Sequence, residues 1–266
     1  CNDVAIGNQM LVDIFSISDK IISLFKNLQI VYDNNLSNFE DIQHMLVGCA
    51  IQVKGEIVES SGNQAIELKA KEVILLGDCP ADYPIQPKRH TREFLREQAY
   101  LRPRTNLFQA VFRVRSVAAY AIHKYFQERN YVYFHAPLIT ASDCEGAGEM
   151  FQVTTLDLDK VAKDGKLDYS KDFFNKPAAL TVSGQLQAET FAMAYKKTYT
   201  FGPTFRAENS NTKTHANEFW MIEPEMAFCD LEELMDIEEE MLKFVLKYVL
   251  DNCPEEINFC DQFVEK

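Results

Sequence analysis

The chain has 266 residues, 47% of them hydrophobic and 25% charged, which is the composition of a globular protein with room for two domains. Its formal net charge of −13 excludes a protein that coats nucleic acid by charge alone, but not one that binds a single RNA through a local basic face. No apolar run approaches the roughly 20 residues of a membrane-spanning helix, so we expect no membrane segment.

The seven cysteines include no CxxC pair, and the five histidines are widely scattered, so we expect no metal site. The odd number of cysteines indicates reduced thiols and a cytoplasmic protein. The amino end lacks the basic and apolar regions of a signal peptide. Because the chain begins with Cys1 rather than Met, we expect a fragment.

Residues 1–27 carry apolar residues at roughly helical spacing and are left unassigned. After them the pattern predicts strands at Leu28–Asp33 and Cys49–Ser60, with a short helix at Asn38–Leu46. Gln64–Gly77 predicts one more strand pair or a single long bent strand. Apolar residues alternate along these strands, which indicates a half-buried sheet, and a small antiparallel barrel fits this pattern.

Asp78–Arg104 is a connector in which four prolines are expected to interrupt regular structure. It is the most basic stretch of an acidic chain. One interpretation is a face along an RNA backbone, where each phosphate contact adds salt-dependent affinity. The alternative is a solvated hinge whose arginines pair with Glu93 and Glu97. The basic side chains are Lys88, Arg89, Arg92, Arg96, Arg102 and Arg104.

Thr105–Arg129 is the clearest helix, and Thr105 is a suitable cap for its amino end. A continuous apolar stripe runs along it, which by itself indicates core packing. The stripe consists of Leu107, Val111, Val114, Ala118, Ala121, Ile122 and Tyr125. A strand is predicted at Tyr131–Pro137, where the proline closes it.

Three polar segments follow. Ser142–Phe151 (SDCEGAGEMF) is a loop whose glycines permit close backbone approach. Asp157–Lys176 is a charged insertion that we expect to be mobile. Ala178–Phe191 contains LTVSGQLQAE, in which Ser-Gly-Gln alone is a common turn.

Tyr199–Phe228 predicts a hairpin, because aromatic and β-branched residues flank a polar loop. It presents a cation, acids, an imidazole and an aromatic ring on one surface, a set that could hold a nucleotide. These residues are Arg206, Glu208, His215, Phe219, Glu223 and Glu225. In the alternative interpretation, Arg206 is a structural partner of Glu223 or Glu225. Phe219 and Trp220 would then pack in the core, which is the interpretation we favour for Trp220.

After the hairpin, Asp230 with Glu233 forms a capping-box pattern that opens a helix. Its apolar positions are expected to face the core: Leu231, Leu234, Ile237, Met241, Val245, Leu246 and Val249. The opposite face is strongly acidic and is interpreted as solvated.

The hairpin also resembles motif 2 of class II aminoacyl-tRNA synthetases, with Phe205-Arg206-Ala207-Glu208 before the loop and His215 to Phe219 after it. Together with SGQL at Ser183–Leu186 and the SDCEGAGEMF loop, this sequence is most similar to the bacterial asparagine-specific family. The resemblance runs from about Leu28 to the end of the chain.

This resemblance implies an α+β fold with a class II synthetase-like, mostly antiparallel catalytic sheet and helices over residues 105–266. An incomplete OB-fold barrel at 28–77, which would bind the anticodon, and the basic linker at 78–104 would precede it. It implies ATP-dependent ligation of asparagine to tRNA(Asn) through an asparaginyl-adenylate, in a homodimer that pairs through residues 105–137.

The resemblance also implies roles for individual residues. Arg206 is the catalytic residue, holding the α-phosphate. The other ATP-binding residues are Glu208, which contacts adenine, Phe219, which stacks on it, and His215, which faces the γ-phosphate. The amino-acid-binding residues are Glu145, Ser183, Gln185, Glu223 and Glu225, of which Glu225 reads the side-chain amide. The tRNA-binding residues are Gln29, Arg102 and Arg104. Read alone, Gln29 is an ordinary exposed strand residue and Glu145 is a loop acid in water.

Ala188 gives the argument for asparagine over aspartate. Aspartate-specific relatives have at this position a lysine that reads the substrate carboxylate. Loss of a cation favours a neutral amide.

Motif 3, a Gly-rich strand ending in Arg, does not occur in the chain. The acids that hold Mg²⁺ in the family are likewise expected outside it. We therefore expect a synthetase truncated before motif 3. The alternatives are aspartyl- or lysyl-tRNA specificity, a non-catalytic nucleotide- or RNA-binding relative, and a paralogue that amidates aspartate.

Overall fold

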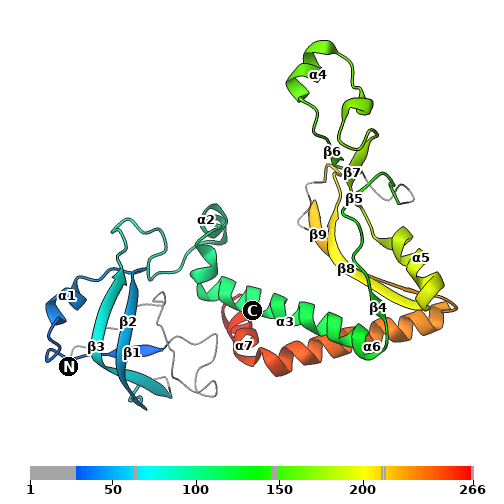
Figure 1. Ribbon diagram of the computed structural model, residues 1–266. Coiled ribbons are helices and arrows are strands. Elements are labelled where there is room, and N and C mark those ends of the chain that lie inside the picture. The colour runs from blue at the N-terminus through cyan, green and yellow to red at the C-terminus, as the bar shows by residue number, and fades with distance from the viewer. Residues whose placement is uncertain are drawn as a thin grey trace. The chain divides into compact units, whose positions relative to one another are not determined.

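The structure, a computed structural model, describes residues 28–62, 65–144, 146, 149–210, 212 and 214–264 (Figure 1). The unassigned segment 1–27 lies outside the described residues. The chain divides into two compact units, one formed by Cys1–Ala119 with Lys247–Lys266 and the other by Tyr120–Leu246.

The first unit contains a three-stranded sheet with the order β1-β3-β2. Its elements are β1 (Gln29–Val31), α1 (Phe39–Gln43), β2 (Ala50–Glu59) and β3 (Ile66–Gly77). The predicted strands and short helix are therefore confirmed, and the third stretch is one long strand. β1 pairs with β3 in parallel and β2 pairs with β3 antiparallel, so the described residues form a mixed sheet and no closed barrel. The OB-fold stays a prediction.

A bulge at Gly55 ends the predicted alternation of β2. The register shifts between Lys54 and Gly55, and a Cβ at Gly55 would lie 2.2 Å from the Lys69 carbonyl oxygen. Only glycine fits so close to the neighbouring backbone. Ile51 and Val53 before the bulge are buried, whereas Ile57 after it is 37% exposed.

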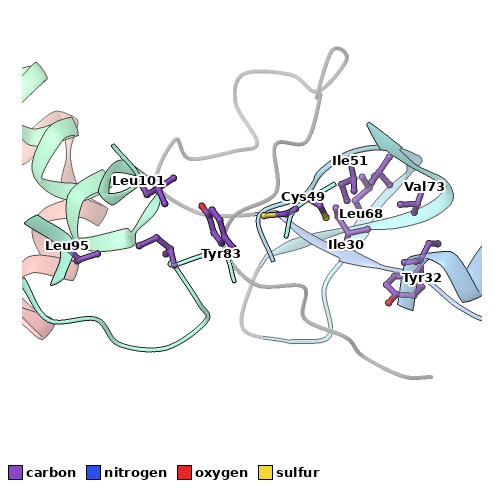
Figure 2. Packing of buried hydrophobic residues seen from close by; sticks show 13 residues of the cluster. Ile30, Tyr32, Cys49, Ile51, Leu68, Val73, Tyr83, Leu95 and Leu101 are labelled. Carbon is purple, nitrogen blue, oxygen red and sulfur yellow. The ribbon is translucent and has the colours of Figure 1, made fainter. Parts of the chain in front are cut away.

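The connector contributes to the core of this unit, so the expectation of an irregular hinge is wrong for part of its length. It contains α2 (Arg92–Glu97) and the short 3₁₀ helix η1 (Arg102–Arg104). Thr91 caps α2 by accepting from the Phe94 N–H at 3.2 Å. Tyr83, Leu95 and Leu101 belong to the same hydrophobic cluster as the sheet residues (Figure 2).

Helix α3 (Asn106–Glu128) has the predicted extent, and the predicted stripe is buried at Ala121, Ile122 and Tyr125. The prediction is wrong at Val111, which is 40% exposed, whereas the neighbouring Ala110 is fully buried. One residue corresponds to about 100° around a helix, so the buried face deviates from the predicted stripe at this position. The buried positions are Ala110, Val117, Ala121, Ile122, Tyr125 and Phe126.

The carboxyl-terminal helices are α6 (Leu231–Asn252) and α7 (Pro254–Phe263). The cap of α6 is confirmed, because the Asp230 carboxylate accepts from the Glu233 N–H at 2.9 Å. The expectation that Leu231 and Leu246 face the core is wrong, since they are 69% and 63% exposed. Val249 is buried, in a small cluster of the first unit with Val117 and Cys253.

The second unit is built on the predicted hairpin, now β8 (Lys197–Phe205) and β9 (Glu218–Met226). β4 (Val132–Tyr133), shorter than predicted, pairs in parallel with β8. A second sheet has the order β5-β7-β6, from Ile139–Thr140, Ala178–Leu180 and Gln152–Val153, and α5 (Gln185–Tyr195) contacts the hairpin (Figure 1). Tyr199 of β8 is fully buried and stacks on Phe126 with ring centroids 4.6 Å apart.

The insertion has regular structure where a mobile segment was expected. It forms α4 (Leu158–Asp164), capped by Asp157, and η2 (Tyr169–Lys171). Asp172 is buried and accepts from the Thr154 hydroxyl at 2.7 Å, and from the backbone N–H groups of Thr155 and Phe173, each at 2.8 Å. These bonds join the end of the insertion to the segment after β6. None of the described helices is both long and apolar enough to cross a membrane.

Candidate active site

The register of the hairpin brings the predicted site residues of β9 onto one face. Glu225 lies opposite Thr198, Glu223 opposite Thr200 and Phe219 opposite Thr204. Directly paired residues share a face and successive residues alternate, so Phe219, Glu223 and Glu225 point to the same side. The other face packs Tyr199 and Phe201 against His123 of α3.

Arg206 follows the end of β8, on the side of Phe219. Its backbone N–H donates to the Asn217 carbonyl at 3.0 Å, and the Asn217 amide donates back at 2.7 Å. The guanidinium carbon lies 5.5 Å from the centroid of the Phe219 ring, and Nη2 donates to the Val182 carbonyl at 3.4 Å.

The Nε of Arg206 is buried without a hydrogen-bond partner. No ion pair joins Arg206 to Glu223 or Glu225, all three of which are described, so the structural-pair interpretation is wrong. A buried donor without an acceptor is costly unless a ligand satisfies it. The arrangement therefore suits an anionic group beside a planar ring.

Glu208 and His215 lie on the loop between the strands. The Glu208 carbonyl accepts from the Ser210 N–H at 2.9 Å. The exposed His215 bonds through Nδ1 to the Thr212 hydroxyl. Among the described residues of the loop, neither side chain is hydrogen-bonded or ion-paired to Arg206. The structure thus places them near one end of the hairpin without joining them to the cation.

Ser183, Gly184 and Glu223 form a hydrogen-bonded cluster where α5 begins. The Ser183 hydroxyl donates to the Glu223 carboxylate, and the Gly184 N–H donates to Glu223 Oε1 at 2.9 Å. The Gln185 N–H donates to Ser183 Oγ at 3.1 Å. The Gln185 amide donates to Glu189 at 3.1 Å.

Three glutamates approach one another beside this cluster. Burial raises the pKa of Glu225 above its usual range, and the charges of Glu189 and then Glu223 raise it further. Glu189 was not predicted; its spacing of four residues from Gln185 on one helix face was the available signal.

Ala188 is completely buried on α5, and its carbonyl accepts from the Thr198 hydroxyl at 3.3 Å. It therefore packs against β8.

A cavity of about 250 Å³ lies along β8, where β4 no longer pairs with it. Its lining includes His123, His135, Thr200, Pro203, Trp220 and Glu223. Trp220 is 48% exposed and meets Phe201 edge-on with ring centroids 5.2 Å apart, so the prediction of core packing for Trp220 is wrong. Alternation puts Trp220 on the face opposite to Phe219, near the open edge.

The remaining predicted residues lie elsewhere. Glu145 lies outside the described residues. Gln29 is on β1. The Arg102 guanidinium lies 4.8 Å from the Phe108 ring centroid, with a buried Nε that has no partner, and Arg104 donates to the Tyr83 hydroxyl at 2.9 Å.

A larger cavity of about 1030 Å³ in the first unit is lined partly by the connector and partly by apolar side chains such as Phe259 and Phe263. Its Lys and Arg residues are Lys88, Arg89, Arg92 and Arg104. No group of three or more His, Cys, Asp or Glu side chains that could hold a metal ion occurs in the described part of the chain.

Comparison with known proteins places this site in context. Residues 91–265 match the model of the family described as tRNA synthetases class II (D, K and N). The chain is 59% identical over 247 residues to the asparagine–tRNA ligases of Clostridium tetani and Clostridium beijerinckii, covering 92% of this chain and 53% of each relative. It thus spans about half the length of the curated relatives it matches.

Solved structures show the same fold. Asparaginyl-tRNA synthetase from Pyrococcus horikoshii, complexed with asparaginyl-adenylate, aligns with a TM-score of 0.75 at 24% identity, over 87% of this chain and 50% of that one. The Entamoeba histolytica asparaginyl-tRNA synthetase aligns with a TM-score of 0.73 at 20% identity, over 90% and 52%. The class II synthetase-like fold, with mixed and antiparallel sheets and helices, is therefore shown.

Proposed function

The chain belongs to the class II tRNA synthetases of the D, K and N group, and from that premise we propose that the full-length protein ligates asparagine to tRNA(Asn) with ATP. Full-length protein here means the product of the complete reading frame that contains these residues. The proposal is supported by the 59% identity to two asparagine–tRNA ligases. The Pyrococcus relative was solved with asparaginyl-adenylate.

The observation that carries the mechanism is the buried, unpartnered Nε of Arg206 beside the Phe219 ring. In the first step, an oxygen of the asparagine carboxylate attacks the α-phosphorus of ATP. The bond to the β-phosphate oxygen breaks, and pyrophosphate leaves. Negative charge gathers on the α-phosphoryl oxygens, where the guanidinium donors of Arg206 stabilise it.

In the second step, a hydroxyl of the terminal ribose of the tRNA attacks the acyl carbonyl, and AMP leaves. No covalent bond to the protein forms in either step. The contribution of the protein is positioning and charge neutralisation. The face of Phe219 supports adenine, Glu208 accepts from its exocyclic amine, and His215 faces the γ-phosphate from the loop.

The amino-acid pocket is proposed on the same face of the hairpin. Gln185 and Glu145 hold the α-amino group, with Ser183 nearby, and Glu223 and Glu225 line the floor. Burial raises the pKa of Glu225 above its usual range, and its carboxyl oxygens are suited to accept a hydrogen bond from the side-chain amide of asparagine. The absence of a cation at Ala188 supports asparagine over aspartate.

Mg²⁺ is expected to assist ATP in this family. The described residues contain no group of three or more His, Cys, Asp or Glu side chains that could hold it.

The tRNA is proposed to contact the first unit. Gln29 would read the central anticodon base from the proposed OB-fold domain. Lys88, Arg89, Arg92 and Arg104 line one cavity, and together with Arg102 they are proposed to contact phosphate groups of the tRNA. A homodimer through residues 105–137 is part of the same proposal.

The test is ATP–pyrophosphate exchange by the full-length protein with asparagine, aspartate or lysine as the amino acid. Exchange that depends on asparagine is expected, and Arg206→Ala should abolish it. Exchange supported by aspartate or lysine instead would contradict the proposed substrate. Exchange that survives Arg206→Ala at nearly the wild-type rate would contradict the role of the arginine.

A further inference from the structure

Both carboxylate oxygens of Glu223 accept hydrogen bonds from the turn at Ser183 and Gly184. Oε2 accepts from the Ser183 hydroxyl and, at 3.2 Å, from the Gly184 N–H, which also donates to Oε1 at 2.9 Å. Gly184 and Glu223 are 39 residues apart in the sequence, so this carboxylate joins β9 to the start of α5. Charged acceptors of this kind make the stronger protein hydrogen bonds.

The Ser183 hydroxyl is committed in the same way. A serine hydroxyl can donate one hydrogen bond, and the Ser183 hydroxyl donates it to Glu223. Its oxygen accepts the Gln185 N–H at 3.1 Å, and the residue is only 8% exposed. The turn also closes on Thr181, whose hydroxyl donates to the Ser183 carbonyl at 2.7 Å. Little of Ser183 remains to contact a ligand.

The turn has no room to shift. A Cβ built on Gly184 would lie 2.9 Å from Thr200 Cγ2, 3.0 Å from Ala136 Cβ and 3.3 Å from Glu223 Oε1. The backbone of Gly184 is therefore wedged against β8 and β9. Gln185, the first residue of α5, follows directly from this fixed point.

We infer that Ser183 and Glu223 are positioning residues that fix Gln185, and that Gln185 rather than either of them contacts the α-amino group of the amino acid. This inference rests on the proposed function. Glu223 acts on the substrate through the Ser183–Gly184 turn, and its own oxygens stay on the turn. Glu223 then lines the floor of the pocket without contacting the substrate, and Glu225 is the floor residue that contacts it.

The experiment compares the exchange kinetics of single and double variants of the full-length protein. Asparagine-dependent exchange by the wild type is measured first, and its absence refutes the proposed function whatever the role of the turn. With an active wild type, Glu223→Gln and Ser183→Ala are expected to raise KM for asparagine about tenfold or more, the cost of losing a charged hydrogen bond. KM for ATP should change less than about twofold.

Double variants separate positioning from contact. Because both residues act through Gln185, Glu223→Gln should have little further effect in a Gln185→Ala background, and Ser183→Thr should recover most of the asparagine affinity by restoring the hydroxyl. An effect of Glu223→Gln that is equally large in the Gln185→Ala background would overturn the inference. Glu223→Asp replaces Glu223→Gln if the latter fails to fold. Glu218→Gln, on the other face of β9, is the matched control.

Discussion

Substitution of Gly184 by alanine tests directly how tightly this glycine is packed against β8 and β9. The added methyl carbon would lie 2.9 Å from Thr200 Cγ2 and 3.0 Å from Ala136 Cβ, both closer than carbon atoms pack. Forcing one extra carbon into a filled site typically costs about 1–3 kcal/mol. We expect Gly184→Ala to lower the free energy of unfolding of the chain by an amount in that range. Urea denaturation followed by far-ultraviolet circular dichroism measures it.

Two further variants make this measurement specific. Gly202, in β8, has no atom within 4 Å of a built Cβ, so Gly202→Ala should change stability by less than about 0.5 kcal/mol. Thr200→Ser removes the Cγ2 methyl group and should relieve part of the cost when combined with Gly184→Ala. Equal stabilities of Gly184→Ala and the wild type, or equal losses at Gly184 and Gly202, would refute the reasoning.

Three other predictions concern the second unit. Hydrogen bonds lower the pKa of Asp172 to about 2, so the stability it contributes is present above the unfolded pKa of about 4 and is lost as the pH falls toward 2. Asp172→Asn should therefore destabilise at pH 7 more than at pH 3 in thermal melts, and a loss of equal size at the two pH values would contradict this reasoning. Burial raises the pKa of Tyr125 and of Tyr131 to about 12, so stability should fall as the pH rises from about 10 through 12. In an absorbance titration at alkaline pH, Tyr131→Phe should remove one phenol that ionises near pH 12. Loss of a phenol that ionises near pH 10 instead would contradict the burial argument. Arg129 pairs with Glu240 at 2.6 Å and lies 3.9 Å from the Tyr125 ring centroid. Arg129→Ala should cost about 1–2 kcal/mol, Arg129→Lys should recover only part, and a cycle with Glu240→Ala that shows no coupling would refute the pairing.

The elements were predictable from sequence where one period dominates. Alternation and a polar loop defined the β8–β9 hairpin, and the 3.6-residue period defined the extent of α3. The predicted stripe holds in the second half of α3, where Ala121, Ile122 and Tyr125 are buried, but not at Val111. An apolar stripe is broad, and the packing partners decide which part of it is covered. The same holds for α6, whose apolar residues Leu231 and Leu246 are exposed.

The part of the site that lies on one strand could be predicted from the alternation of side chains along that strand. Phe219, Glu223 and Glu225 are odd-numbered residues of one strand, so a shared face followed from the pattern. The bond from Gly184 to Glu223 joins segments 39 residues apart, and no local pattern indicates it. Trp220 is predicted to pack in the core, but it lies beside the open edge of β8, where a large ring can remain half exposed.

Trp220 also gives the protein its own optical reporter. It is the only tryptophan in 266 residues, so all indole emission comes from the edge of the cavity that Glu223 also lines. About half of its surface is exposed to water, and its ring meets that of Phe201 edge-on. We therefore expect its fluorescence to change when a molecule displaces water from this cavity, so that occupancy can be followed in the unlabelled chain without introducing a dye.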